Sequence, residues 1–140
     1  MQFEFKIAGL PVSTNDIWRS ARRGSGVKVH KSEAYQAYLL TVKSAIRASG
    51  YAHNLFDAAL GRPFKMRIEL HRPSWIARNG NLKRPDLTNC IKSCEDAICS
   101  ALGWDDVFNF HTEVMKVDKA LSEFHVVKFW FYDTYCAPDQ

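Results

Sequence analysis

Hydrophobic and polar residues repeat with two different periods along the chain, and these periods predict its elements. Alternation with period two predicts four strands, at residues 2–9, 64–71, 110–117 and 124–132. Apolar residues at helical spacing predict one helix from Ser32, a capping residue, to about Ser49, before Gly50. A second helix is predicted for the block that begins at Asp86.

The order of these elements, βαβαββ, predicts an α+β fold with two helices on one mixed sheet. A polar turn around Asp118 and Lys119 separates the last two strands and predicts a C-terminal hairpin. The segments 10–26 and 72–85 contain Pro, Gly and Asn and are predicted to be loops. With 140 residues and no repeat or linker, the chain is expected to be a single domain over residues 1–140.

Positive charge is concentrated in the predicted loops, although the net charge of the whole chain is only +4. Residues 15–31 hold five basic residues against one acid, and residues 71–92 hold the same balance. Trp18 and Trp75 interleave with these charges, an arrangement typical of a nucleic-acid footprint. The plainer alternative for either stretch is a solvated loop.

The cysteines and the remaining composition exclude several classes of protein. Cys90 and Cys94 stand four residues apart in the predicted second helix, where they are expected to pack as small apolar side chains. The cysteines do not have the spacing of a zinc site, and no His lies at ligand spacing near them. The start of the chain lacks the pattern of a signal peptide, and no apolar run reaches membrane-spanning length. A cytoplasmic protein without membrane contact is therefore expected.

The second helix separates an apolar face from a polar ridge. Leu87, Ile91, Cys94, Ile98 and Leu102 share one face, which is predicted to join the core. On the opposite side, Asn89, Lys92 and Asp96 are predicted to be neighbours. On an ordinary solvated surface, these three side chains would form only a Lys–Asp ion pair with a polar neighbour.

Acids at both ends of this block favour a functional interpretation. Asp86 precedes the first helical turn, and Asp105-Asp106 follows a tight exit at Gly103. Lys83 and Arg84 come directly before the first acid. Carboxylates around a lysine are what a metal-assisted phosphodiesterase requires, because a hard divalent ion needs oxygen ligands and the phosphate needs a cation.

Two motifs follow one another along the chain. The first is the Pro-x-Ser-x-Asn segment at 11–15, followed by a basic and aromatic stretch. The second is Asp-x-x-Asn-x-x-Lys-x-x-x-Asp-Ala at 86–97, followed by the pair Asp105-Asp106. In this order the two motifs resemble the RusA family of Holliday junction resolvases, which usually carries Asp-Leu-Asp-Asn where this chain has Asp86-Leu87-Thr88-Asn89.

The resemblance implies a homodimeric endonuclease that depends on Mg²⁺ or Mn²⁺ and nicks four-way DNA junctions symmetrically. Asp86 and Asp106 match catalytic metal-binding aspartates, Lys92 matches the catalytic lysine, and Asp105 matches the first member of the acidic pair. Thr88 occupies the position of a further aspartate. A hydroxyl is a poorer ligand for Mg²⁺ than a carboxylate, so weaker metal affinity is expected. A helix N-cap is the alternative role for Thr88.

Two further expectations concern the substrate. Asn89 is expected to hold an acid or a substrate oxygen by hydrogen bonding. The side chains expected to bind DNA are Asn15, Arg19, Arg22, Arg23, Lys28, Arg78, Lys83 and Arg84.

Two other functions remain open from the sequence. One is a junction- or branched-DNA-binding protein with weakened or absent cleavage. The other is an α+β domain whose basic loops bind a protein partner.

Overall fold

The computed structural model describes residues 2–24, 26–50 and 62–132 of the chain. The strands are β1 (Gln2–Ala8), β2 (Trp18–Arg23), β3 (Gly26–Lys31), β4 (Phe64–His71), β5 (Asn109–Val117) and β6 (Phe124–Phe131). The helices are η1 (Thr14–Asp16), α1 (Glu33–Ala48), α3 (Thr88–Leu102) and η2 (Asp106–Phe108). Within these residues, no helix is long and apolar enough to cross a bilayer.

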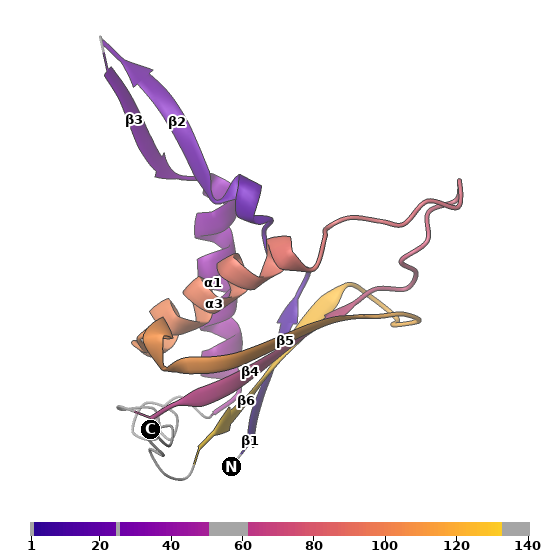
Figure 1. Ribbon diagram of the computed structural model, residues 1–140. Helices are drawn as coiled ribbons and strands as arrows, with labels where there is room; N and C mark the ends of the chain where they lie inside the picture. The colour runs from indigo at the N-terminus through magenta and orange to yellow at the C-terminus, as the bar shows by residue number, and fades with distance from the viewer. Residues whose placement is uncertain (1, 25, 51–61, 133–140) are drawn as a thin grey trace, which may run out of the picture.

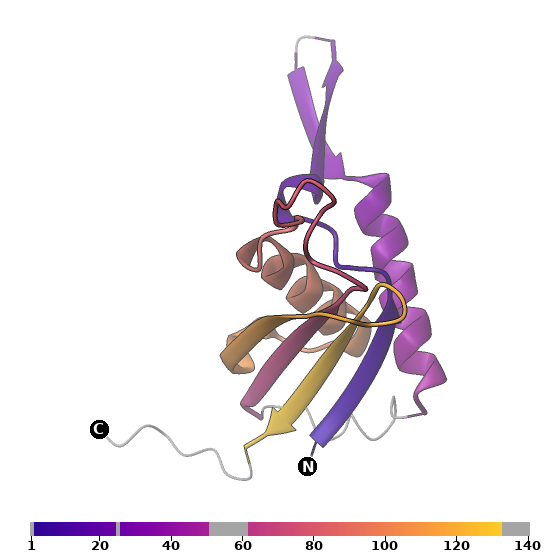
Figure 2. The ribbon, with the colours of Figure 1, turned by 90° about the vertical axis from the view of Figure 1, so that its right-hand side faces the viewer.

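The predicted α+β fold with a mixed sheet and two long helices is confirmed. Four strands form one sheet in the order β1-β6-β4-β5, and α1 and α3 lie on the same face of it (Figures 1 and 2). Strand β4 pairs antiparallel with β6 and parallel with β5. The parallel pair is possible because α3 carries the chain back across the sheet between β4 and β5.

The predicted C-terminal hairpin is wrong, because β5 and β6 do not pair with each other. Both strands pair with β4, which lies between them. The connection after β5 passes over the end of β4, where the amide of Arg72 donates to the Val117 carbonyl and the amide of Ala120 donates to the Arg72 carbonyl. A short polar turn between two strands therefore crosses a third strand here instead of closing a hairpin.

The predicted loop at residues 10–26 is also partly wrong, since it contains a strand. Strands β2 and β3 form a separate antiparallel ribbon, called here the ribbon, that projects from the rest of the molecule (Figures 1 and 2). The sequence did carry a signal, because Val27 and Val29 alternate with Lys28 and His30. All six residues of β3 are exposed.

The core lies between the helices and the sheet. Alternate residues of β4, such as Met66 and Ile68, are buried, as are Tyr38 and Val42 of α1. Ser32 caps α1 as predicted, because its hydroxyl accepts a hydrogen bond from the Tyr35 amide at 3.1 Å.

The apolar face of α3 packs into this core. Cys90, Cys94 and Ile98 are fully buried, and Leu102 is nearly so. Burial raises the pKa of the Cys94 thiol to about 12, so this cysteine stays a neutral thiol at neutral pH. The two predicted core cysteines therefore act as small apolar residues.

Trp75 serves packing rather than binding. Its side chain is 6% exposed, and its indole N–H donates to the Val117 carbonyl at 2.9 Å. The side chains of Arg72 and Lys116 lie over its ring. Of the two tryptophans in the basic stretches, only Trp18 is exposed.

His125 joins β6 to α1 in a fully buried hydrogen-bonded group. Its Nδ1 lies 2.8 Å from the carbonyl oxygen of Gly9, and its Nε2 lies 3.0 Å from the hydroxyl of Tyr38. Because a carbonyl only accepts, Nδ1 donates to Gly9 and Nε2 accepts from Tyr38. Burial lowers the pKa of His125 to about 4, so the ring is neutral in the folded protein at neutral pH.

This buried histidine predicts a loss of stability in mild acid. The unfolded chain, in which the pKa of His125 is about 6.5, binds a proton that the folded chain does not bind until near pH 4. The free energy of unfolding is therefore expected to fall by up to about 3 kcal/mol as the pH decreases from 6.5 to 4. Urea unfolding at pH 7 and pH 4.5 measures this loss, and His125→Gln is expected to reduce it. An equally steep loss in His125→Gln would assign it to other groups.

Candidate active site

The Pro-x-Ser-x-Asn segment lies directly on α3. The hydroxyl of Thr14 donates to the backbone carbonyl of Asn89 at 2.9 Å, and the hydroxyl of Ser93 donates to the carbonyl of Val12. Ser13 caps η1, as its hydroxyl accepts from the Asn15 amide. The two motifs of the sequence are thus joined, and η1 leads from α3 into the ribbon.

A cleft of about 620 Å³ lies between the base of the ribbon and the C-terminal half of α3. Trp18 and Lys31 line it from the ribbon, and Tyr35 lines it from α1. Asp96 and Asp106 line the opposite wall. Asp105 lines the cleft as well, so the cleft brings both strands of the ribbon, both long helices and η2 around three of the motif acids.

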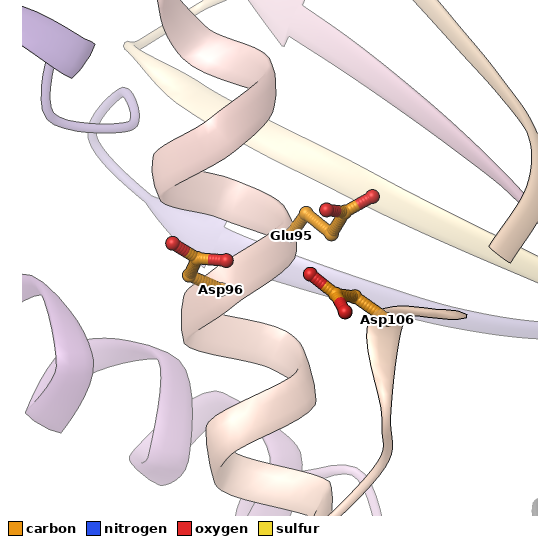
Figure 3. A group of neighbouring side chains, drawn as sticks. All are labelled: Glu95, Asp96 and Asp106. Atoms are coloured by element: carbon orange, nitrogen blue, oxygen red, sulfur yellow. The ribbon is translucent and has the colours of Figure 1, made fainter. Parts of the chain in front are cut away.

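Three carboxylates converge beside this cleft, and two of them, Asp96 and Asp106, line it. Glu95 and Asp96 come from adjacent positions of α3, and Asp106 comes from the start of η2. One carboxylate oxygen of each residue lies within 4.8 Å of those of the other two, and Asp106 points toward the turn of α3 that carries Glu95 and Asp96 (Figure 3). These residues are called the acidic cluster below.

Lys92 provides the positive charge of the site. Its ammonium donates to Asp96 Oδ1 at 2.9 Å and lies 3.8 Å from Asp106 Oδ2. The hydrogen bond to Asp96 raises the pKa of Lys92 above its usual value, so the side chain is a cation at neutral pH and not a base. Its exposure of 54% leaves it accessible to a ligand.

Residues next to the acidic cluster in sequence and space position its carboxylates. Asp105 caps η2 by accepting a hydrogen bond from the Val107 amide at 3.0 Å, which orients the neighbouring Asp106. The side-chain amide of Asn109 donates to Glu95 Oε2 at 2.6 Å. Local hydrogen bonds thus fix the Glu95 carboxylate directly, and they fix the turn that carries Asp106 through its neighbour Asp105.

Tyr35 completes the cleft from α1. Its side chain is only 2% exposed, and Lys31 lies over its ring at 5.6 Å. Burial raises its pKa first, and the charge of Asp96 raises it further. Its hydroxyl therefore remains protonated next to the acids, where it can donate a hydrogen bond.

Asp86 and Thr88 lie at the other end of α3 and are not members of the acidic cluster. Thr88 is the first residue of the helix and stands eight positions before Asp96, about 12 Å along the axis. Asp86 lies two positions earlier, and its backbone carbonyl accepts from the Asn89 amide. The N-cap is Leu87, without a side-chain hydrogen bond, so Thr88 does not cap this helix.

The residues predicted to bind DNA lie on two projecting segments. Asn15, Arg19 and Lys28 are exposed on η1 and the ribbon. Arg22 and Arg23 belong to β2, but their side chains are outside what the structure describes. Arg78 and Arg84 are exposed and Lys83 is half-buried on the loop 72–87, which leads into α3 (Figure 1).

Sequence reasoning did not assign Glu95 or Tyr35 to the site. Glu95 lies between the core face and the polar ridge of α3, so helical spacing alone did not join it to Lys92. Its only local signal was its position next to Asp96. Tyr35 followed the apolar period of α1 and was counted as core.

Comparison with solved structures finds 7 matching chains, and the likeness to one of them is of low quality. The chain is similar to the crystal structure of 2C-methyl-D-erythritol 2,4-cyclodiphosphate synthase from Plasmodium vivax, with 11% sequence identity, a TM-score of 0.29 and 91% of both chains covered. A TM-score this low carries no argument about fold or function. Comparison with curated protein sequences gives no match.

The sequence profile described as "Endodeoxyribonuclease RusA" matches residues 9–126. The match includes the Pro-x-Ser-x-Asn segment, the ribbon, Lys92 and the acidic cluster. It also spans both helices and all of β4 and β5. The chain therefore belongs to the RusA endodeoxyribonuclease family.

Proposed function

We propose that this protein is a divalent-metal-dependent endonuclease that resolves four-way DNA junctions by paired symmetric nicks. The observation that carries this proposal is the placement of the Lys92 ammonium between Asp96 and Asp106 at an open cleft. Membership of an endodeoxyribonuclease family supports phosphodiester hydrolysis as the reaction. The junction as substrate comes from the family resemblance.

The acidic cluster has the chemistry of a site for Mg²⁺ or Mn²⁺. Its three carboxylates offer hard oxygen donors within 4.8 Å of one another, which suits a small divalent cation. Asp106 and Asp96 would hold the ion, with Glu95 beside them. A bound divalent ion supplies Lewis-acid stabilisation of phosphate charge and lowers the pKa of water.

The remaining groups of the cleft act on the phosphate. Hydrolysis adds water across the bond between phosphorus and the 3′ oxygen, and negative charge builds on the phosphate oxygens. Lys92 stabilises this charge, as a cation in a partly enclosed site does. Asp105 orients Asp106, and Asn89 holds a substrate oxygen near the start of α3. Asp86 is proposed as a metal ligand on the family resemblance alone; it lies at the other end of α3 and would not share an ion with Asp96 and Asp106 of the same chain.

DNA would lie across both basic projections. Exposed Arg19 and Lys28 on the ribbon and Arg78 and Arg84 on the loop 72–87 would contact backbone phosphates. Such contacts give affinity that falls steeply with salt and carry little sequence information. A two-fold homodimer would match the two equivalent strands cut at a junction.

A labelled synthetic four-way junction incubated with the protein and Mg²⁺ or Mn²⁺ tests this function. Paired nicks at symmetric positions, absent when EDTA is added, are expected. Linear duplex of the same sequence is the control. Intact junction at every metal concentration would contradict the proposal.

A second candidate is a branched-DNA-binding protein with weakened or absent cleavage. It is favoured by Thr88, a neutral residue where the family usually has an aspartate, and by the absence of Asp86 from the acidic cluster. A shifted but uncut junction in the same assay would select this candidate.

Adding the carboxylate that the family usually has is expected to strengthen metal binding. In Thr88→Asp, a new acid stands one helical turn before Lys92, at an exposed position where a helix start favours negative charge. About 12 Å from a divalent ion at the acidic cluster, one unit charge in watery surroundings contributes roughly 0.7 kcal/mol. About threefold tighter Mn²⁺ binding and faster cleavage are therefore expected.

Calorimetric titration with Mn²⁺ measures this change. The matched control is Thr41→Asp, which adds the same charge to an exposed position of α1 and is expected to change neither quantity. Equal affinity in the two variants would place Thr88 outside the metal site.

A further inference from the structure

The ribbon projects from the rest of the described protein and meets it at its base, where Lys31 lies over the ring of Tyr35. Strands β2 and β3 contact each other extensively, and the ribbon extends beyond both helices (Figures 1 and 2). A two-stranded ribbon of this kind is marginally stable alone in water. Its exposed side chains are therefore available for a ligand.

The two faces of the ribbon differ in chemistry. Residues directly opposite in an antiparallel pair share a face, and neighbouring residues alternate between faces. The register pairs Trp18 with Lys31 and Ser20 with Val29, while Arg19 pairs with His30. One face thus carries Trp18, Val27 and Val29, which are 55%, 68% and 60% exposed, with Lys31 and Arg22 at the register positions opposite Trp18 and Val27. The other face carries Arg19, Lys28 and His30 and none of these large apolar residues. The first is called the apolar face and the second the basic face.

The apolar face continues into the cleft. Trp18 and Lys31, the pair at the base of the ribbon, line the cleft together with Asp96 and Asp106. A ligand that occupies this cleft beside Asp96 and Asp106 therefore also lies beside Trp18. The basic face points away from this wall, since its residues alternate with those that line the cleft.

The charge of the ribbon selects nucleic acid over protein as its occupant. Residues 18–31 contain five basic residues and no acid. Nucleobases offer apolar π-faces beside phosphates, so one ligand can satisfy an apolar face and the positive charges that flank it. In linear duplex these base faces are covered by their stacked neighbours, whereas a branch point can open them.

We propose that the apolar face of the ribbon receives nucleobases opened at the branch point of DNA, with Trp18 as the stacking platform at the mouth of the cleft. This inference rests on the proposed function and deepens it, because it names the side chain that makes the protein bind branched DNA more tightly than linear DNA. Lys28, on the basic face, contacts phosphates of either form.

Binding measurements on two variants of the same ribbon test this assignment. Asp106→Asn protein without added metal is titrated with a four-way junction and with linear duplex. Trp18→Ala is expected to weaken junction binding about 5- to 30-fold, the effect of losing stacking on a base, and to leave duplex binding unchanged. Lys28→Ala is expected to weaken both to a similar extent, and Trp18→Phe is expected to retain most of the junction affinity.

A junction with abasic sites next to the branch point identifies the ligand group. If Trp18 stacks on those bases, Trp18→Ala has no further effect on the abasic junction, because the two changes remove the same contact. Equal weakening of intact and abasic junctions, or of junction and duplex, would overturn the inference. So would dissociation of a homodimer by Trp18→Ala, which would make a second copy of the chain the occupant.

The role of Trp18 can fail while the proposed nuclease activity holds, and the two failures give different results. Paired nicking by the unmodified protein, with no effect of Trp18→Ala on junction affinity, would retain the nuclease and reject the role of Trp18. Leu40→Ala, which removes an equally exposed apolar side chain from α1, is the control and is expected to bind both DNAs normally.

Discussion

Asp106→Asn is expected to abolish junction cleavage while leaving junction binding intact. Asp106 contributes a carboxylate to the acidic cluster and lies 3.8 Å from the ammonium of Lys92. The amide has the same shape without the charge, so the fold is retained and the divalent ion loses a strong ligand. A fall in the cleavage rate of at least about 10³-fold is expected, since removing one strong transition-state interaction has effects of roughly this size.

Cleavage under saturating DNA and the Mn²⁺ affinity are measured together. Both are expected to fall in Asp106→Asn, whereas the gel shift of the junction remains. The matched control is Glu4→Gln, which removes one negative charge from the face of the sheet opposite the helices. Normal cleavage by Asp106→Asn would exclude the acidic cluster as the catalytic centre.

Lys92→Gln is expected to separate metal binding from chemistry. The ammonium forms ion pairs with Asp96 and Asp106, so it competes with a divalent ion for the same carboxylates. Without it, Mn²⁺ affinity is expected to stay equal or increase. The cleavage rate is nonetheless expected to fall by roughly 10²- to 10³-fold, because the charge that stabilises the phosphate is lost.

This opposite response of two measurements distinguishes a catalytic lysine from a structural one. A structural role of Lys92 would lower the unfolding temperature together with metal affinity. Lys43→Gln, an exposed lysine of α1, is the control for the change in net charge. If Lys92→Gln cleaves at the normal rate, the cation does not act on the phosphate.

Local patterns predicted most of the elements because each depends on neighbouring residues. Ser32 and the helical period bounded α1, and the alternation at 64–71 matched β4 at both ends. The period of α3 also placed Lys92 and Asp96 on one ridge, where the structure has their ion pair. The hairpin failed because strand neighbours depend on the whole sheet: β4 pairs with both β5 and β6 and separates them.

By itself, the sequence determined the α+β class, the family and the residue types of a metal-assisted phosphodiesterase, because periodicity and spacing are local properties of the chain. Only the tertiary structure decided which acids meet. The turn at Gly103 and the cap by Asp105 bring Asp106 back to Glu95 and Asp96, whereas the axial rise of α3 leaves Asp86 at its far end. The exposure of Trp18 and the burial of Trp75 were likewise decided by packing, since both stand in similarly basic stretches of sequence.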